Sequence, residues 1–397
     1  MAPLKIIYYS PHPTHDIVSE VGYSTHQRET INAFKQLGHE VICVVMGGTE
    51  KKAVTHFHHE LENKSGKAGL IKKLLPGFLW NALKDIRLLQ HDKKAGRKLE
   101  EAIKAHQPDL VYERGEYFQD SGVVMAEKYG IRHYLEVNSP VVEEMAAFEG
   151  PDLLRFLGHK KERTKLEKTH KVFAVSSAIK EYLIHRYNCN KEITIIPNCI
   201  NPEAWSVEDE LTNSLNKKAS GQFTVGFVGS LFPYHGVHLL IDAFAIFIKT
   251  NANARLIVVG DGAIKEALLK QAESSLPEGS FVFTGKVQHK DALRFIESFT
   301  VAVMPASNWY GSPVKIFEYG LLGKPIIAPD NGPVRDVMHP YVDGFLVNAN
   351  SKDIADKLEF VVNNQEEANK RAVHFREKIL SQYTWKKQAE TILRDLS

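Results

Sequence analysis

The stretch Ser312-Pro-Val-Lys-Ile-Phe-Glu-Tyr-Gly-Leu-Leu-Gly-Lys-Pro325 decides the fold of this chain. An apolar run over residues 300–305 precedes it and predicts a buried strand, and residues 326–328 predict the next one. Between the two strands, the spacing of apolar residues predicts a helix over residues 314–322, and Gly323 is a helix stop. The stretch therefore predicts one strand–loop–helix–strand unit of a parallel α/β sheet.

The predicted helix would carry a ligand site at its N-terminal end. Its spacing buries Val314 and Phe317 on one face. Lys315, Glu318 and Tyr319 point away from that face. Helix N–H groups at the carboxyl end of a strand bind anions such as a diphosphate. Lys315 would add positive charge, and Glu318 would accept hydrogen bonds from sugar or ribose hydroxyls.

The bulk composition favours a two-domain protein of the cytosol. The chain has 397 residues, which is too long for one core. It is 43% hydrophobic and 25% charged, and its net charge of +2 gives no reason to expect a nucleic-acid partner. Three cysteines without metal-ligand spacing fit a reducing compartment. We expect neither a signal peptide nor a transmembrane helix.

Two successive β–α series run along the chain. The first begins with a strand over residues 5–9, and the second begins with a strand over residues 223–228. Residues 208–221 are polar and aperiodic, so we predict domains at 1–207 and 208–384. Each series predicts a doubly wound, Rossmann-like domain, and two such domains predict a cleft between facing strand ends.

Polar residues follow the strands of the first series. Arg114 and Glu116 follow one predicted strand, and Glu136 and Asn138 end the next. We expect them at an acceptor site, although Glu136 and Asn138 are equally consistent with structural hydrogen bonding. Gly22 opens the first helix, either where the backbone meets a donor or as an ordinary loop glycine.

Glycine-rich loops follow the strands of the second series and predict the donor site. His235, in the first of these loops, is either a ligand of the diphosphate or a capping or core histidine. The remaining donor-site candidates are Gly229, Ser230, Gly262, Gly311, Ser312, Pro313 and Val314.

Residues 64–98 form a basic region with ten Lys or Arg against two Asp. Within it, residues 70–80 mix charge with large apolar groups, including Phe78 and Trp80. This segment either lies on an anionic membrane surface, with both aromatic rings inserted, or is the solvated face of an ordinary core helix.

Several motifs in sequence order resemble family 4 glycosyltransferases. In the second half they are residues 229–236, Gly260-Asp-Gly262, Phe283-Thr-Gly-Lys286, residues 312–319 and Gly344-Phe-Leu-Val347. In the first half they are Gly38-His-Glu-Val41, Val175-Ser176 and Ile196-Pro-Asn198. The resemblance implies the GT-B fold, with two Rossmann-like domains facing across a cleft. It also implies retaining sugar transfer from a UDP- or GDP-type donor, with neither a metal nor a cofactor required.

The sequence departs from the family pattern at the site. Ser230 and His235 stand where the family usually has an Arg and a Lys for the diphosphate. Tyr310 replaces the first of two glutamates, whereas Glu318 matches the second, which implies ribose binding. Arg114 stands where a catalytic histidine often occurs. The resemblance therefore implies catalytic roles for Lys315, His235 and Arg114, and a last helix, residues 385–397, that joins the first domain.

We expect an acceptor hydroxyl on a glycan, a lipid-linked sugar or a small molecule. The protein would work in the cytoplasm, with peripheral contact at the inner membrane face if residues 64–98 bind lipid. A nucleotide-sugar 2-epimerase of the same fold is the alternative enzyme, and a hinge-closing binding protein is the alternative outside enzymes. Only one positioned carboxylate, Glu318, is evident, which fits neither a glycosidase nor a serine hydrolase.

Overall fold

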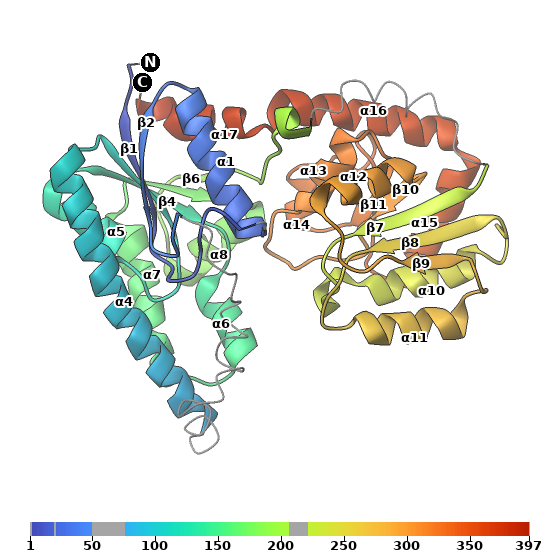
Figure 1. Cartoon of the computed structure of the whole chain (residues 1–397), viewed down its shortest axis with the longest axis horizontal. Coiled ribbons are helices and arrows are strands. Elements are labelled where there is room, and N and C mark those ends of the chain that lie inside the picture. The colour runs from blue at the N-terminus through green and yellow to red at the C-terminus, as the bar shows by residue number, and fades with distance from the viewer. Residues whose placement is uncertain (1, 20, 50–75, 206–220, 397) are drawn as a thin grey trace. The chain divides into compact units, whose positions relative to one another are not determined.

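The computed structural model describes residues 2–19, 21–49, 76–205 and 221–396 (Figure 1). It divides into two compact units. Unit 1 comprises residues 1–196 and 385–397, and unit 2 comprises residues 197–384. The predicted linker, residues 208–221, lies almost entirely outside the described residues, as do residues 64–75 of the basic region.

Unit 1 contains a six-stranded parallel sheet in the order β2-β1-β3-β4-β5-β6. Its strands are β1 (Lys5–Ser10), β2 (Glu40–Val45), β3 (Leu110–Arg114), β4 (Arg132–Val137), β5 (Lys171–Ala174) and β6 (Ile193–Ile195). Its helices are α1 (Gly22–Gln36), α4 (Gly77–His106), α5 (Ser121–Tyr129), α6 (Val141–Glu149), α7 (Arg155–Lys168), α8 (Ser177–Tyr187) and α17 (Trp385–Leu393), with the 3-10 turn η3 (Arg394–Leu396).

Helices cover both faces of this sheet. Residues of α4 and α5 pack with Ile7, Tyr9 and Val111 on one face. On the other face Phe34 of α1 meets the Tyr112 ring edge-on, with ring centroids 5.3 Å apart. The chain returns to this unit at its end, where Trp385 of α17 contacts the His26 ring of α1 edge-on. A strand with helices on both faces buries the side chains of both faces, which explains the apolar run in β1.

Unit 2 contains a second six-stranded parallel sheet in the order β12-β11-β10-β7-β8-β9. Its strands are β7 (Phe223–Val228), β8 (Ala254–Val259), β9 (Phe281–Phe283), β10 (Val301–Val303), β11 (Ile326–Pro329) and β12 (Phe345–Val347). Its helices are α10 (Val237–Phe247), α11 (Lys265–Ser275), α12 (His289–Ser298), α13 (Val314–Leu321), α14 (Gly332–Arg335), α15 (Ser351–Asn363) and α16 (Gln365–Gln382), with the 3-10 turns η1 (Pro202–Trp205) and η2 (Pro233–His235).

The core of unit 2 forms two layers. Val225 and Phe227 pack with α10, α11 and α15 on one face. Val228 and Ala302 pack with α12, α13 and α16 on the other. The prediction of two doubly wound parallel domains is confirmed. None of the described helices is long and apolar enough to cross a membrane.

The helix predicted over residues 314–322 forms as α13, but its faces differ from the prediction. Val314 is 47% exposed, whereas Tyr319 is fully buried. The Tyr319 hydroxyl accepts a hydrogen bond from the Val228 N–H at 2.9 Å. The helix is therefore rotated about its axis relative to the prediction, so that Tyr319 faces the end of β7. A buried Tyr hydroxyl needs a hydrogen-bond partner, and the backbone of Val228 supplies it.

Candidate functional site

Each sheet has one point at which the strand order reverses. In unit 2 the chain adds β8 and β9 on one side of β7 and then adds β10 on the other. In unit 1 the chain adds β2 beside β1 and then adds β3 on the opposite side. Ligands of open parallel sheets bind at the carboxyl ends of the strands at such a switch point. Most of the predicted site residues lie at the carboxyl ends of β3, β7 and β10 at these points, whereas Glu136 and Asn138 lie at the end of β4 and Gly262 follows β8.

Lys315 is the central cation at the switch point of unit 2. Its ammonium lies 3.1 Å from Nε2 and 3.4 Å from Nδ1 of His235, and 5.5 Å from the centroid of the Phe227 ring. Ser230 Oγ lies 3.4 Å from Nε2 of the same histidine. Among the described residues Lys315 has no carboxylate close enough for an ion pair. The fold therefore brings three predicted residues together: the cation Lys315, His235 and Ser230.

Burial changes the protonation of this pair. Burial lowers the pKa of Lys315 to about 8, and the charge of Glu318 only partly offsets that effect. Burial, and then the charge of Lys315, lowers the pKa of His235 to about 3. His235 is therefore neutral at pH 7 and can accept a hydrogen bond from the ammonium. An anion placed here would restore the favourable charge balance that Lys315 lacks.

Two glycines let the backbone come close to Lys315. Gly229 has φ +150°, and a Cβ there would lie 2.1 Å from Cε of Lys315. Gly260 has φ +138°, and a Cβ there would lie 1.9 Å from the carbonyl oxygen of Gly229. Side chains at either position would close the space over the lysine. Gly262 has the same function nearby, because its Cβ would meet the backbone of Leu231 at 2.5–2.8 Å.

Glu318 lies one turn after Lys315, and its side chain is 17% exposed. His289, at the first position of α12, approaches it with Nε2 3.3 Å from Oε1. His289 was not among the residues expected at the site. Only its position at the start of an amphipathic helix could have indicated it, because the contact joins residues 29 positions apart.

The loop between β10 and α13 is fixed by its own polar contacts. Ser312 Oγ accepts from the Asn198 N–H at 2.8 Å, and the Asn198 side chain donates to the Ser312 carbonyl at 3.0 Å. The Gly311 N–H donates to Asn308 Oδ1 at 2.7 Å. Pro313 is buried and stands at the N-cap position of α13. Ser312 and Gly311 therefore shape the loop, and the anion-binding role expected for them stays a prediction.

In unit 1, the predicted acceptor residues meet at the other switch point. The guanidinium of Arg114 lies 3.4 Å from Glu116 and 3.7 Å from Glu136. Burial alone would lower the pKa of Arg114, but these two carboxylates outweigh it and raise that pKa. Glu116 also contacts Nδ1 of His15 at 2.9 Å. Burial alone would raise the pKa of Glu116, but His15 foremost, with Arg114 adding, lowers it to about 2.

Glu136 is fully buried and accepts hydrogen bonds from several neighbours. Tyr112 donates to one of its oxygens, and Asn138 donates to the other at 2.6 Å. His26 Nε2 lies 3.2 Å from the same oxygen as Asn138, and burial lowers the pKa of His26 to about 4. Glu136 thus holds Asn138 and Arg114 in place. The sequence was consistent with either an acceptor contact or structural hydrogen bonding for Glu136, and its burial favours structural hydrogen bonding.

His12, His15 and Glu116 lie close enough to raise the question of a metal ion. Their donor atoms all lie within 4.8 Å of one another. The two imidazole rings, however, are stacked, with centroids 3.6 Å apart and planes 20° apart. A metal lies close to the plane of each imidazole that binds it, so nearly parallel stacked rings do not direct lone pairs at one ion. We assign the cluster to hydrogen bonding.

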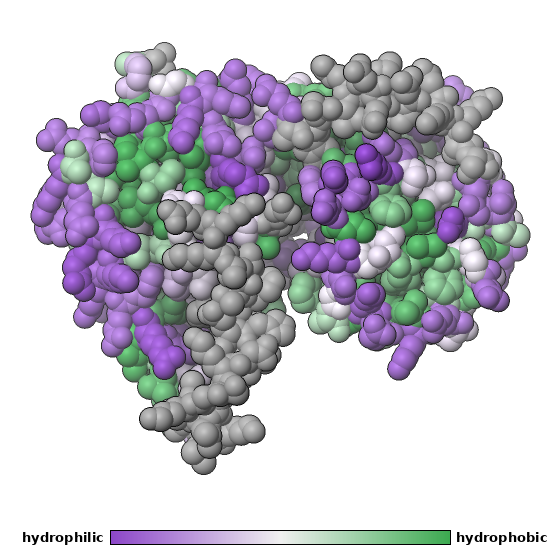
Figure 2. Space-filling model, viewed as in Figure 1, coloured by the Kyte–Doolittle hydropathy of each residue, from purple (hydrophilic) through white to green (hydrophobic). Residues whose placement is uncertain are grey.

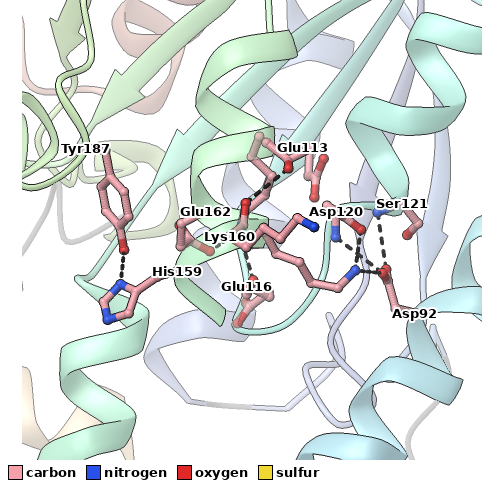
Figure 3. Close-up of polar contacts among 12 residues, drawn as sticks. Asp92, Glu113, Glu116, Asp120, Ser121, His159, Lys160, Glu162 and Tyr187 are labelled. Atoms are coloured by element: carbon pink, nitrogen blue, oxygen red, sulfur yellow. Dashed lines mark hydrogen bonds and ion pairs between the residues drawn. The ribbon is translucent and has the colours of Figure 1, made fainter. Parts of the chain in front are cut away.

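A largely buried ionic network lies beside Glu116 (Figure 3). Lys165 of α7 pairs with Glu162 and donates to the carbonyl oxygen of Glu116 at 2.9 Å. Lys161 on the same helix pairs with Asp92 of α4 at 2.9 Å and also with Asp120. These contacts tie α4, α7 and the loop after β3 together, which fixes the position of Glu116.

The role expected for Gly22 stays a prediction. Gly22 is the first residue of α1, and a Cβ there would meet nothing within 4 Å. The protein itself therefore does not require glycine at this position, and a ligand would have to supply the reason.

The chain matches two family descriptions in succession. Residues 22–204 match "Glycosyltransferase Family 4", and residues 209–378 match "Glycosyl transferases group 1". The capsular polysaccharide biosynthesis glycosyltransferase CapM of Staphylococcus aureus is 26% identical over 209 residues, which is 49% of this chain and 52% of that protein. The chain spans about half the length of the curated relatives it matches.

Two solved structures share the fold over nearly the whole chain. Sucrose-phosphate synthase of Thermosynechococcus elongatus has a TM-score of 0.71 at 17% identity, covering 99% of both chains. The Anabaena protein HepE in complex with UDP has a TM-score of 0.69 at 16% identity, again covering 99% of both chains. At this identity the likeness establishes the fold.

Proposed function

We propose that the chain, which belongs to glycosyltransferase family 4, transfers a sugar from a nucleoside diphosphate donor to an acceptor hydroxyl. The observation that carries this proposal is Lys315, a half-buried cation without an ion-pair partner among the described residues, at the switch point of unit 2. Glu318 one turn later supplies the acceptor for ribose hydroxyls. The donor is of the UDP or GDP type, and UDP is bound in the structure of HepE.

The reaction breaks the bond between the anomeric carbon and the diphosphate oxygen, and it forms a bond from the acceptor oxygen to that carbon. Negative charge develops on the departing diphosphate, and Lys315 would stabilise it there. His235 is neutral and would orient the ammonium rather than add charge. The acceptor proton passes to the departing phosphate oxygen on the same face, which accounts for retention without a separate base.

The acceptor side is assigned to unit 1. Arg114, Glu116 and Asn138 would present the hydrogen-bonding groups, and Glu136 would hold them from the buried side. We propose a positioning role for Arg114, because two carboxylates already engage its guanidinium. The acceptor class is a glycan, a lipid-linked sugar or a small molecule. Similarity to CapM favours polysaccharide biosynthesis.

Calorimetry with UDP, GDP and their sugars tests the donor site. Glu318→Ala should weaken the preferred nucleotide by about 1.5–3 kcal/mol, the scale of a lost hydrogen bond to a charged group. Glu273→Ala, an exposed change on α11, is the control and should leave binding unchanged. Equal affinity for wild type and Glu318→Ala would remove the ribose role of Glu318.

Product analysis separates transfer from epimerisation. A transferase releases nucleoside diphosphate in step with formation of a new glycoside when acceptor extract is added. An epimerase would instead convert the donor into a second nucleotide sugar with no new glycoside, and a binding protein would do neither. Formation of glycoside with the anomeric configuration of the donor sugar is the expected result.

A further inference from the structure

Exposed apolar side chains gather at one end of unit 1. Leu79, Leu83 and Ile86, spaced by four and three residues on α4, are 36–42% exposed, and Phe78 is 40% exposed. This spacing places Leu79, Leu83 and Ile86 on one face of the helix. Apolar clusters of this size on a surface mark contact with a partner or a membrane more often than chance exposure does.

The start of α7 adds to the same end of the unit. Leu153 is 54% exposed and Phe156 is 64% exposed. The Asn81 side chain of α4 donates to the carbonyl oxygens of residues 149 and 151, at 2.8 and 3.0 Å. These bonds fix the first turns of α4 to the segment that leads into α7. We name the six side chains the apolar end: Phe78, Leu79, Leu83, Ile86, Leu153 and Phe156.

On the α4 side of the apolar end, the exposed charges all have one sign, whereas Asp152 beside Leu153 is acidic and partly exposed. From residue 77 to residue 98, the exposed ionisable side chains are Arg87, Lys93, Lys94, Arg97 and Lys98. The acidic residues of this segment, Asp85 and Asp92, are both buried. None of the five basic side chains forms an ion pair with another described residue. Green apolar surface next to purple hydrophilic surface is visible at the lower end of unit 1 in Figure 2.

We propose that the apolar end docks on an anionic membrane surface, with α4 entering N-terminal end first. Apolar side chains of such a surface insert into the headgroup boundary, and cations beside them attract anionic lipid. Arg87 directly follows the apolar residues of α4, whereas Lys98 lies about 16.5 Å further along the helix at 1.5 Å per residue. That distance exceeds the Debye length of about 8 Å at physiological salt, so Arg87 contributes more than Lys98.

This surface differs from the one that the sequence suggested. Trp80, which the membrane alternative would insert, is 7% exposed and packs inside unit 1, as the core-helix alternative requires. Lys84, one of the ten basic residues of the region 64–98, pairs with Glu149. Lys72 and Lys73 lie outside the described residues. The docking surface is independent of the proposed transfer reaction, because vesicle binding needs neither donor nor acceptor.

Vesicle sedimentation tests the proposal with the full chain. Vesicles of phosphatidylcholine containing about 30% phosphatidylserine should bind the protein at 50 mM salt, and pure phosphatidylcholine vesicles should not. Leu83→Glu with Ile86→Glu should lower binding at least tenfold. Ile246→Glu, at a residue of α10 that is 47% exposed, is the matched control and should bind like wild type. Melting temperature and UDP affinity verify that each variant is folded.

The remaining outcomes would overturn the proposal. Absence of binding at low salt, or equal binding to neutral vesicles, removes the anionic membrane as the partner. Sedimentation velocity that shows a dimer dissolved by Leu83→Glu assigns the apolar end to a second copy of the chain. Arg87→Gln should weaken vesicle binding several-fold and Lys98→Gln less than twofold, and equal losses would overturn the end-first orientation.

Discussion

Replacing Lys315 by methionine should stabilise the folded protein and at the same time weaken the donor. The ammonium is buried beside a neutral histidine, and its pKa is lowered to about 8 against an ordinary value of 10.5. Since one pKa unit corresponds to 1.36 kcal/mol, holding the charge at pH 7 costs the folded state about 3 kcal/mol. Lys315 keeps partial exposure and its contacts with His235 and Phe227, so we expect a net gain of about 1–2 kcal/mol.

The pH dependence has a definite sign. The folded-state pKa is depressed, so between about pH 8 and 10.5 the unfolded chain binds more protons than the folded one. The free energy of unfolding therefore rises with pH across that window as the lysine loses its proton, and Lys315→Met should abolish this rise. Binding of a diphosphate should restore the proton, so wild type should take up most of one proton on binding UDP at pH 8.5, whereas Lys315→Met should take up none.

Denaturant unfolding and calorimetry in two buffers of different ionisation enthalpy measure both effects. Lys324→Met is the matched control, because burial also lowers the pKa of Lys324 to about 8 while its ammonium donates to the Glu297 carbonyl, away from the loop that holds Gly229. That variant should leave UDP affinity unchanged. Unaltered UDP affinity in Lys315→Met, together with lower stability, would refute the reasoning.

Two further predictions concern unit 1. Burial, and then Asp152, raises the pKa of Asp85 to about 8, so this group's contribution to stability is full below about pH 4 and is lost as pH rises to about 8. Asp85→Asn should remove that loss, and urea unfolding from pH 5 to 8 should show its advantage growing by up to about 1.4 kcal/mol per pH unit. Lys165→Met should cost about 3–5 kcal/mol, because it leaves Glu162 buried without its partner. Adding Glu162→Gln should recover most of that loss in the same unfolding experiment, and no recovery would contradict the ion-pair explanation.

The strands were predictable because local sequence alone determines them. An apolar run before a glycine-containing loop indicated β7 at its observed bounds, residues 223–228. The helix after β10 was also predictable, but its orientation was not. Tyr319 is buried because its hydroxyl forms a hydrogen bond with the backbone of Val228, 91 residues earlier. The spacing of residues within a helix cannot predict a partner so distant in sequence.

The candidate site was predictable to the same extent. Lys315, His235 and Ser230 follow strands whose carboxyl ends meet, so their proximity followed from topology. The contact of His289 with Glu318 and the pairing of Lys84 with Glu149 did not follow, because each joins side chains from helices whose rotation depends on packing. Pairing across long sequence separations also explains how Lys84, in a basic region of the sequence, has an acidic partner.

The charges at the two switch points differ, and this difference supports assigning the acceptor to unit 1 and the donor to unit 2. At the switch point of unit 1, two carboxylates surround the guanidinium of Arg114, and burial keeps His12 and His26 neutral with pKa values of about 3 and about 4. That cluster already pairs its guanidinium with carboxylates of its own, so it offers a diphosphate no cation without a partner and suits the hydroxyl groups of an acceptor. At the switch point of unit 2, Lys315 remains without an ion-pair partner among the described residues, and a diphosphate is the group that would supply one. In the full chain, donor affinity that fell with Glu116→Gln and not with Lys315→Met would contradict this assignment, whereas weaker binding of a neutral sugar acceptor in Glu116→Gln would support it.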